Sequence, residues 1–344
     1  MSPELSTQSQ EMPSFGVEEV LIAGNRGPCA GVNMALDATD QVLSIVDGRE
    51  PVYTNWPVVN NRRIASELSG RGLNVFNNDW SKVPDGSIVM FSAHGVTPEH
   101  HRIAGEKGSL TVDTTCQLVT KVHSMAHEAE AQGLHVVYIG KEGHPETVGV
   151  MSEVDEANVD LIDAEYAARD INKLNIGTGE DCIVYSQTTL MPDEVVDIEK
   201  TLARRFTDIE IPDRNGICYA TFSRQKAVEK LVESGIGLLL VVGSPESHNS
   251  QMLRRKGERL KIPSYSIDYP HELMPEWFTG VRKVGVTSGA SVLDRFMDEV
   301  AVWIEARSPS ASRSYQEQVK REPMDARYPL PEESLESLRQ RFSK

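Results

Sequence analysis

The sequence predicts an α/β protein built from parallel sheets, and two observations support this fold class. Short apolar runs alternate along the chain with amphipathic helical segments, which is typical of parallel sheets covered by helices. In addition, an apolar run, a bend carrying a cysteine and a helical segment recur three times. With 344 residues the chain is long enough for two or three domains with cores of their own.

Each expected strand is a short apolar run, and each expected helix carries apolar residues at helical spacing, as in Val119, Val122 and Ala126. The expected strands, in chain order, are Val20–Ala23, Pro51–Thr54, Leu73–Phe76, Ser87–Ser92, His135–Ile139, Val159–Ile162, Cys182–Ser186, Ile209–Ile211, Gly237–Val242, Ser264–Ile267 and Lys283–Thr287. The expected helices are Met34–Ile45, Asn61–Arg71, Leu118–Gln132, Pro192–Phe206, Ser223–Ser234, Ser250–Leu260 and a final one that ends near Ala306.

These elements group into five ranges. Residues 1–16 are rich in Ser, Glu, Gln and Pro and predict a flexible lead. Residues 17–115, 116–212 and 213–306 each predict one α/β domain with one of the recurring cysteines. Residues 307–344 predict a C-terminal tail that is ordered but irregular, with a short last helix.

The charge balance and the hydropathy pattern exclude several classes of function. Lys and Arg number 35 against 51 Asp and Glu, a net charge of −16 that argues against binding nucleic acid or an anionic membrane. The first residues lack the basic and apolar regions of a signal peptide, and the longest apolar run, around Leu238–Val242, is too short to span a bilayer. We therefore expect a cytoplasmic protein without a membrane segment.

Three cysteines occupy equivalent positions in the repeated pattern. Cys29 lies in the glycine-rich bend Gly24–Val32, and Cys116 and Cys218 likewise precede helical segments. Cys182 lies inside an apolar strand and is expected to be a buried small hydrophobe. Zinc sites usually use close cysteine pairs, which are absent here, whereas three distant thiolates suit a four-iron cluster with one open iron. Three unrelated buried thiols remain the alternative, and spacing alone does not decide between them.

Small polar side chains and histidines follow several of the expected strands. Ligands of open α/β sheets bind at the carboxyl ends of the strands, so these residues are expected to meet at one edge. Hydroxyls, amides and imidazoles beside glycine-rich bends can hold a phosphate or diphosphate. Glu146, two residues after a histidine, is a candidate proton donor. The residues that follow strands in this way are His94, His144, Thr188, Ser247, Asn249 and Ser291.

Seven short motifs follow the expected strands or open the expected helices. They are Arg26–Val32, Phe91–Val96, Cys116–His123, Gly143–Glu146, Ser186–Leu190, Ile217–Thr221 and Val286–Ser291. In their order and spacing, these motifs resemble the LytB/IspH family of 4-hydroxy-3-methylbut-2-enyl diphosphate reductases. The resemblance extends from about Val17 to Ala306.

The resemblance implies three α/β domains in a pseudo-threefold trefoil around a [4Fe-4S] cluster. It implies that Cys29, Cys116 and Cys218 are the cluster ligands and that one iron stays open for the substrate. By the same resemblance Glu146 supplies a proton with support from Thr188, and a ferredoxin or flavodoxin delivers the electrons. The residues implied to bind the diphosphate are His94, His144, Ser247, Asn249 and Ser291.

The chain departs from the family pattern next to the expected ligand. Asn60 stands where the family has a histidine, His248 stands where it has a serine, and Gln117 replaces a proline. We count Asn60 and His248 among the expected substrate-binding residues. We expect the family's reductase, the last enzyme of the non-mevalonate isoprenoid pathway, with a rearranged clamp. The alternatives are a paralogue that applies the same chemistry to a different substrate and a non-catalytic iron–sulfur sensor. The retained Glu146 and Thr188 argue against the sensor, which needs no proton relay.

Overall fold

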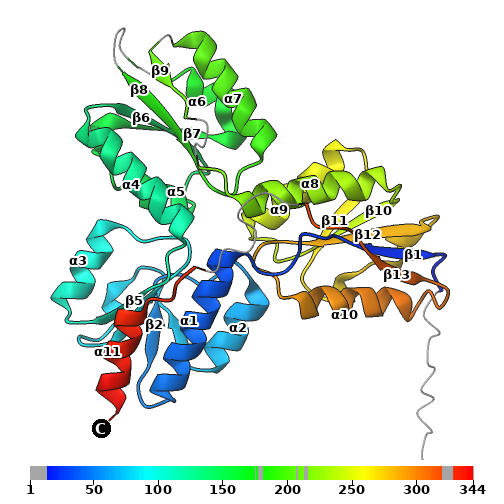
Figure 1. Ribbon diagram of the computed structural model, residues 1–344, viewed down its shortest axis with the longest axis horizontal. Coiled ribbons are helices and arrows are strands. Elements are labelled where there is room, and N and C mark those ends of the chain that lie inside the picture. Colours follow the sequence, from blue (N-terminus) through cyan, green and yellow to red (C-terminus); the bar gives the residue numbers. More distant parts are fainter. Residues whose placement is uncertain are drawn as a thin grey trace, which may run out of the picture.

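A computed structural model of the chain describes residues 14–174, 176, 181–206, 208–212, 216–319 and 328–343 (Figure 1). Most of the expected N-terminal lead, residues 1–13, lies outside this part. Within the described residues the strands form three sheets, and every neighbouring pair of strands is parallel. Each sheet lies in its own lobe, and the three lobes meet at the centre of the molecule (Figure 1). The predicted α/β trefoil is therefore confirmed.

The first sheet has the strand order β3-β2-β4-β5. Its strands are β2 (Val52–Thr54), β3 (Leu73–Val75), β4 (Ile88–Phe91) and β5 (Leu110–Asp113), with helices α2 (Arg62–Gly70) and α3 (Pro98–Glu106) between them. The sequence did not predict α3 or β5. α3 is a short polar helix that begins at Pro98 after an N-cap from Thr97, and β5 is a half-buried strand at the edge of the sheet.

The second sheet repeats this order as β7-β6-β8-β9. Its strands are β6 (His135–Gly140), β7 (Val159–Asp163), β8 (Cys182–Ser186) and β9 (Ile209–Glu210). Its lobe also contains the helices α4 (Gln117–Ala131), α5 (Pro145–Met151), α6 (Ala167–Ile171) and α7 (Pro192–Arg205).

The third sheet differs from the predicted division of the chain, because its order is β11-β10-β12-β1-β13. Its strands are β10 (Leu238–Val242), β11 (Ser264–Ile267), β12 (Lys283–Ser288), β1 (Glu19–Ile22) and β13 (Ser312–Tyr315), and its helices are α8 (Tyr219–Glu233), α9 (His248–Arg259) and α10 (Asp294–Glu305). β1 falls in the predicted range 17–115, yet it pairs with β12 and β13. A strand with buried residues on both faces needs two neighbours, and these two supply its hydrogen bonds. We propose that β1 be counted with the third domain.

With β1 placed there, the three sheets share one design. If the strands of each sheet are numbered 1 to 4, their order across the sheet is 2-1-3-4 in all three sheets. In the third sheet β10, β11 and β12 are strands 1 to 3, and β1 takes the place of strand 4. The helices α4 and α8 start after the fourth strand of one sheet and pack on the next sheet. α1 (Ala30–Val46) likewise leaves the third sheet and lies in the lobe of the first (Figure 1). The predicted threefold repeat is therefore a cyclic one.

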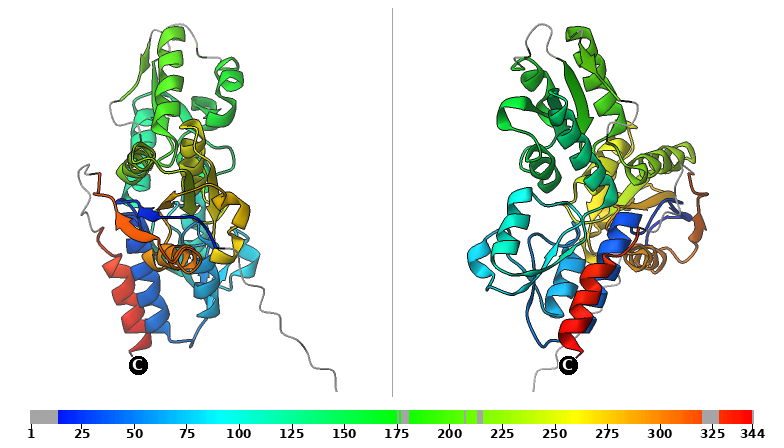
Figure 2. Two further views of the ribbon diagram at one scale, coloured as in Figure 1. Left: turned by 90° about the vertical axis from the view of Figure 1, so that its right-hand side faces the viewer. Right: turned by 60° about the vertical axis from the view of Figure 1, so that its left-hand side comes forward.

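The C-terminal tail is more regular than predicted. Besides β13 it contains the helix α11 (Glu332–Phe342), which lies side by side with α1 in both views (Figure 2). Leu335 and Leu338 of α11 are fully buried at this contact. The polar residues of β13 did not predict a strand. This strand pairs with the edge of β1 through its backbone, which requires no apolar side chains.

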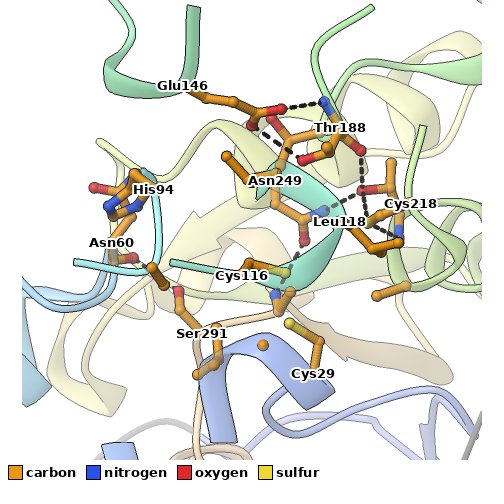
Figure 3. A pocket seen from close by; sticks show the side chains of 18 of the residues that line it. Cys29, Asn60, His94, Cys116, Leu118, Glu146, Thr188, Cys218, Asn249 and Ser291 are labelled. Carbon is orange, nitrogen blue, oxygen red and sulfur yellow. Dashed lines mark hydrogen bonds between the residues drawn. The ribbon is translucent and has the colours of Figure 1, made fainter. Parts of the chain in front are cut away.

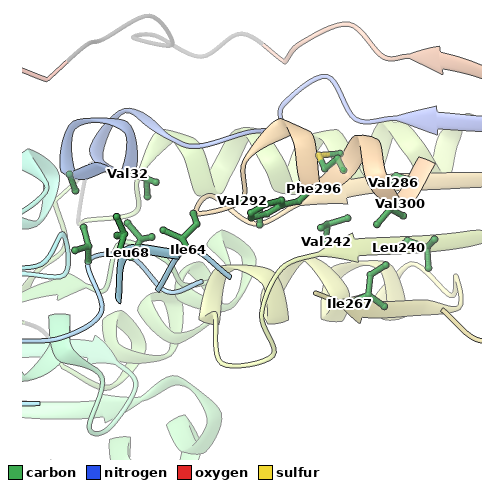
Figure 4. Packing of buried hydrophobic residues seen from close by; sticks show 14 of the residues in the cluster. Val32, Ile64, Leu68, Leu240, Val242, Ile267, Val286, Val292, Phe296 and Val300 are labelled. Atoms are coloured by element: carbon green, nitrogen blue, oxygen red, sulfur yellow. The ribbon is translucent and has the colours of Figure 1, made fainter. Parts of the chain in front are cut away.

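The largest apolar cluster joins the first and third lobes. It combines α2 residues such as Ile64 and Leu68 with Leu240 and Val286 of the third sheet and Phe296 of α10 (Figure 4). The second lobe has clusters of its own around β6 and β8. Short 3₁₀ turns complete the described elements: Trp80–Lys82, Glu156–Asn158, Ala164–Tyr166, Pro270–Glu272 and Pro275–Phe278. In the described part of the chain, no helix is long and apolar enough to cross a membrane.

Candidate active site

The three repeated cysteines meet where the lobes meet. Cys29, Cys116 and Cys218 are the N-cap residues of α1, α4 and α8, so each lies at the point where the chain leaves a fourth strand. All three line one cavity of about 110 Å³ (Figure 3). Cys182 does not line it; that side chain is buried in β8, as predicted.

Every other residue predicted for the site also lines this cavity. They come from all three lobes: Asn60, His94, His144, Glu146, Thr188, Ser247, His248, Asn249 and Ser291. Gln117, which departs from the family pattern, is the first residue of α4 and is not among the lining residues. The structure thus brings the predicted residues together, and their individual roles remain predictions.

Two glycines allow the cysteine turns to come close to neighbouring lobes. A Cβ atom on Gly31 would lie 2.6 Å from the sulfur of Cys116, so any other residue at this position would displace that sulfur. Gly216 has a φ of +134°, and a Cβ there would lie 2.0 Å from the carbonyl oxygen of Ser186. The two glycines therefore determine how closely the turns that carry Cys29 and Cys218 can approach the neighbouring lobes.

The electrostatics of the cysteines indicate that thiolates here need a cationic partner. Burial raises the pKa of the Cys116 thiol to about 12, and the nearby Cys29 adds to the shift. Burial and Cys29 also raise the pKa of Cys218, whose sulfur lies 3.2 Å from the backbone nitrogen of Thr221, a hydrogen-bond donor. Three neighbouring thiolates repel one another, whereas a bound metal centre keeps its thiol ligands deprotonated.

Three thiols from separate lobes around one cavity are a donor set that a multi-iron cluster could use. Among the described residues, no three His, Cys, Asp or Glu side chains lie close enough to hold one metal ion. In a cluster each thiolate binds a different iron, so the sulfurs stay farther apart than the ligands of one ion.

A buried carboxyl lies on the opposite wall from Cys29. Glu146, in the first turn of α5, is 3% exposed and accepts two hydrogen bonds from Thr188, at 2.7 Å from the backbone nitrogen and 3.0 Å from the hydroxyl (Figure 3). Burial raises its pKa to about 7, although the hydrogen bonds from Thr188 act in the opposite direction. At neutral pH this carboxyl therefore carries a proton for part of the time.

The remaining wall is polar and built from strand ends. Asn249 accepts from the backbone nitrogen of Ala290 at 3.0 Å, and the Ser291 hydroxyl donates to the backbone oxygen of Asn60 at 2.8 Å. Ser247 caps the N-terminus of α9, so this helix directs its partial positive charge toward the cavity. The wall can therefore hold an anion through dipoles and neutral donors.

Sequence reasoning missed some lining residues. Thr221 lies one turn into α8 and bonds Cys218, while Tyr328 comes from the tail. Burial and then Cys116 raise the pKa of Tyr328. Tyr328 precedes α11 by a few residues, and the packing of α11 against α1 brings it to the cavity.

The chain is similar to proteins of known name over most of its length. The family model described as LytB protein matches residues 20–305. A 4-hydroxy-3-methylbut-2-enyl diphosphate reductase of Actinobacillus pleuropneumoniae serotype 5b (strain L20) is 39% identical over 281 residues, 82% of this chain and 88% of that protein. Another protein of that name, from Aliivibrio fischeri (strain MJ11), is 39% identical over 290 residues, 84% of this chain and 90% of its own length.

Two solved structures are similar as well. The E-1-hydroxy-2-methyl-but-2-enyl-4-diphosphate reductase from Plasmodium falciparum has a TM-score of 0.86 at 26% identity and covers 94% of this chain and 99% of its own. The structure described as (E)-4-hydroxy-3-methyl-but-2-enyl diphosphate reductase, the terminal enzyme of the non-mevalonate pathway, has a TM-score of 0.60 at 26% identity. It covers 84% of this chain and 100% of its own.

Proposed function

Because the chain belongs to the LytB family, we propose that it reduces 4-hydroxy-3-methylbut-2-enyl diphosphate to isopentenyl and dimethylallyl diphosphate. The reaction breaks the bond between carbon and the hydroxyl oxygen, takes up two electrons and two protons, and releases one water. The observation that carries the proposal is the meeting of three cysteine-capped helices and a buried acid at one cavity. The comparisons favour this reaction over a different substrate or a sensor.

We propose Cys29, Cys116 and Cys218 as the three ligands of a [4Fe-4S] cluster. When bound, such a cluster supplies single electrons and, at the iron without a cysteine, a Lewis acid for the leaving oxygen. The protein contributes the thiolates from three lobes and the tight turns that bring them together. A ferredoxin or flavodoxin is the proposed electron donor.

Glu146 is the proposed proton donor. Its carboxyl is buried in the cavity wall, so a proton that it carries is held away from bulk water until the leaving oxygen arrives. Thr188 holds both carboxylate oxygens and so fixes their direction. We further propose that the polar wall holds the diphosphate, through His94, His144, Ser247, His248, Asn249, Ser291 and Asn60.

The cytoplasm is the proposed location of the reaction. The three cysteines that line the cavity, Cys29, Cys116 and Cys218, are free thiols, which fits a reducing compartment.

Two measurements test the proposed function. Anaerobic reconstitution with iron and sulfide should give an iron–sulfur absorption band, and Cys116→Ser should lose it. Cys182→Ser is the matched control, since this thiol is buried away from the cavity and its loss should leave the band intact. The reconstituted protein, supplied with a strong chemical reductant, should convert 4-hydroxy-3-methylbut-2-enyl diphosphate to the two products. An intact band without turnover would contradict the proposed substrate, and a band unchanged by Cys116→Ser would contradict the ligand assignment.

A further inference from the structure

Three histidines form a row along the cavity wall. His94 follows β4, His144 is the N-cap of α5 and His248 is the first residue of α9. The ring centroids of His94 and His144 are 6.2 Å apart, and those of His144 and His248 are 6.1 Å apart. All three rings line the same cavity. The spacing allows one ligand with several anionic oxygens to touch more than one ring.

Each ring is oriented by the protein through the same nitrogen. Nδ1 of His94 lies 3.2 Å from the Ser92 hydroxyl, and Nδ1 of His248 lies 3.3 Å from the Thr189 hydroxyl. Nδ1 of His144 accepts from the backbone nitrogen of Glu146 at 3.2 Å. Nε2 is thus the nitrogen that each ring leaves for a ligand in the cavity.

The Nδ1 partners give the rings different capacities for protons. Because a backbone N–H cannot accept, Nδ1 of His144 stays unprotonated and its Nε2 carries the proton of the neutral ring. A hydroxyl can donate or accept, so His94 and His248 can each hold protons on both nitrogens. His144 is therefore a neutral donor, and the outer two rings can become cations.

We propose that these histidines form one three-imidazole anion site, in which His248 gains a proton when the diphosphate binds. The proposal rests on the proposed function, because it takes the diphosphate as the ligand of this wall. It assigns His248, which stands where the resemblance expects a serine, as a binding residue of this chain's own site. It also assigns a reason for the change, since Asn60 cannot supply a cation at any pH.

The charges around His248 support this direction. Burial lowers its pKa to about 4, and Lys141 and Arg255 act the same way, so the ring is neutral in the free protein. Asp163 and a hydrogen bond to the backbone of Thr189 favour the cation, and His144 faces the ring from α5. A diphosphate adds negative charge to this site, which favours the imidazolium and raises its pKa. Binding and proton uptake are then linked.

The test measures proton uptake by calorimetry. Reconstituted protein without reductant, so that nothing turns over, is titrated with inorganic pyrophosphate at neutral pH in two buffers of different ionisation enthalpy. His248→Gln keeps a hydrogen-bond donor but cannot gain a proton, and the difference between the two proteins cancels the protonation of pyrophosphate itself. We expect the variant to take up fewer protons than the wild type and to bind about tenfold more weakly, because a charged hydrogen bond is lost. His127→Gln, an exposed histidine on α4, is the control and should match the wild type.

Three outcomes would overturn the proposal. These are equal proton uptake by the wild type and His248→Gln, equal affinity of the two, and no pyrophosphate binding by the wild type. Iron content and the melting temperature of His248→Gln identify a folding defect. Should one occur, a fall in proton uptake by His248→Asn tests the same site with a shorter amide. The turnover assay decides the proposed function separately, since an active enzyme with unchanged proton uptake overturns the histidine site alone.

Discussion

The hydrogen bonds from Thr188 lower the pKa of Glu146, and Thr188→Val removes one of them. Valine has nearly the shape of threonine and keeps the backbone N–H that bonds Oε1 at 2.7 Å. The hydroxyl bond to Oε2, at 3.0 Å, is lost. This bond stabilises the charged carboxylate, so its loss makes the carboxyl hold its proton to higher pH.

The size of the shift follows from the energy of the bond. A hydrogen bond to a charged group contributes about 1.5–3 kcal/mol, and about 1.4 kcal/mol corresponds to one pH unit. The pKa of Glu146, about 7 in the wild type, should therefore rise by about one to two pH units. Because a proton donor works only when protonated, the wild-type rate should fall as the pH rises above 7. The variant should keep its rate to correspondingly higher pH.

The assay is kcat between pH 6 and 10 with reduced methyl viologen, whose potential does not depend on pH. Thr147→Val is the matched control, because this neighbouring buried hydroxyl donates to Gln187 at 3.3 Å and not to Glu146. In this control, kcat should fall with rising pH over the same range as in the wild type. Glu146→Gln should lower kcat by a factor of about 10²–10⁴ and abolish its fall at alkaline pH. If kcat of Thr188→Val falls at the same pH as in the wild type or at a lower pH, the hydroxyl of Thr188 does not lower the pKa of the proton donor.

Two substitutions test the packing that supports the site. Gly31→Ala should lower the iron content after reconstitution, because its Cβ would lie 2.6 Å from the sulfur of Cys116. Gly70→Ala, which meets open space at the end of α2, should not, and equal iron contents would contradict the steric argument. Leu338→Ala should destabilise the docking of α11 by about 2–5 kcal/mol, since a fully buried side chain is removed. Limited proteolysis should then cut the C-terminal helix faster, and an unchanged rate would mean that Leu338 does not anchor the helix.

Local patterns predicted most elements of the fold but not how they pair. The apolar runs that became β6, β8 and β10 were found within a residue or two, because buried central strands must be continuously apolar. β1 was found too, but a short apolar run does not specify its partners, so it was grouped with the strands that follow it. β13 escaped notice because Ser312–Tyr315 lies at a sheet edge, where backbone pairing suffices.

That the predicted site residues share one cavity follows from the topology, because most of them come directly after strands. Parallel strands end at one edge, so a polar residue after each strand is placed by topology alone, as with His94, Thr188 and Ser291. Contacts between lobes carry no such signal. Nothing near Gly31 in the sequence indicates that it faces Cys116, and Tyr328 reaches the cavity only because α11 docks on α1.

The cyclic arrangement explains why this cavity depends on all three lobes at once. Each proposed cluster ligand caps a helix that starts from the fourth strand of one sheet, and α4 and α8 pack on the following sheet. A shift of one lobe therefore moves a cysteine on one side and a helix on the other. The histidine row also depends on more than one lobe. His144 belongs to the second lobe and His248 to the third, and the ring of His248 is oriented by Thr189 of the second lobe. A ligand that bridged the row would therefore contact the second and the third lobe at once, beside the wall that holds Glu146.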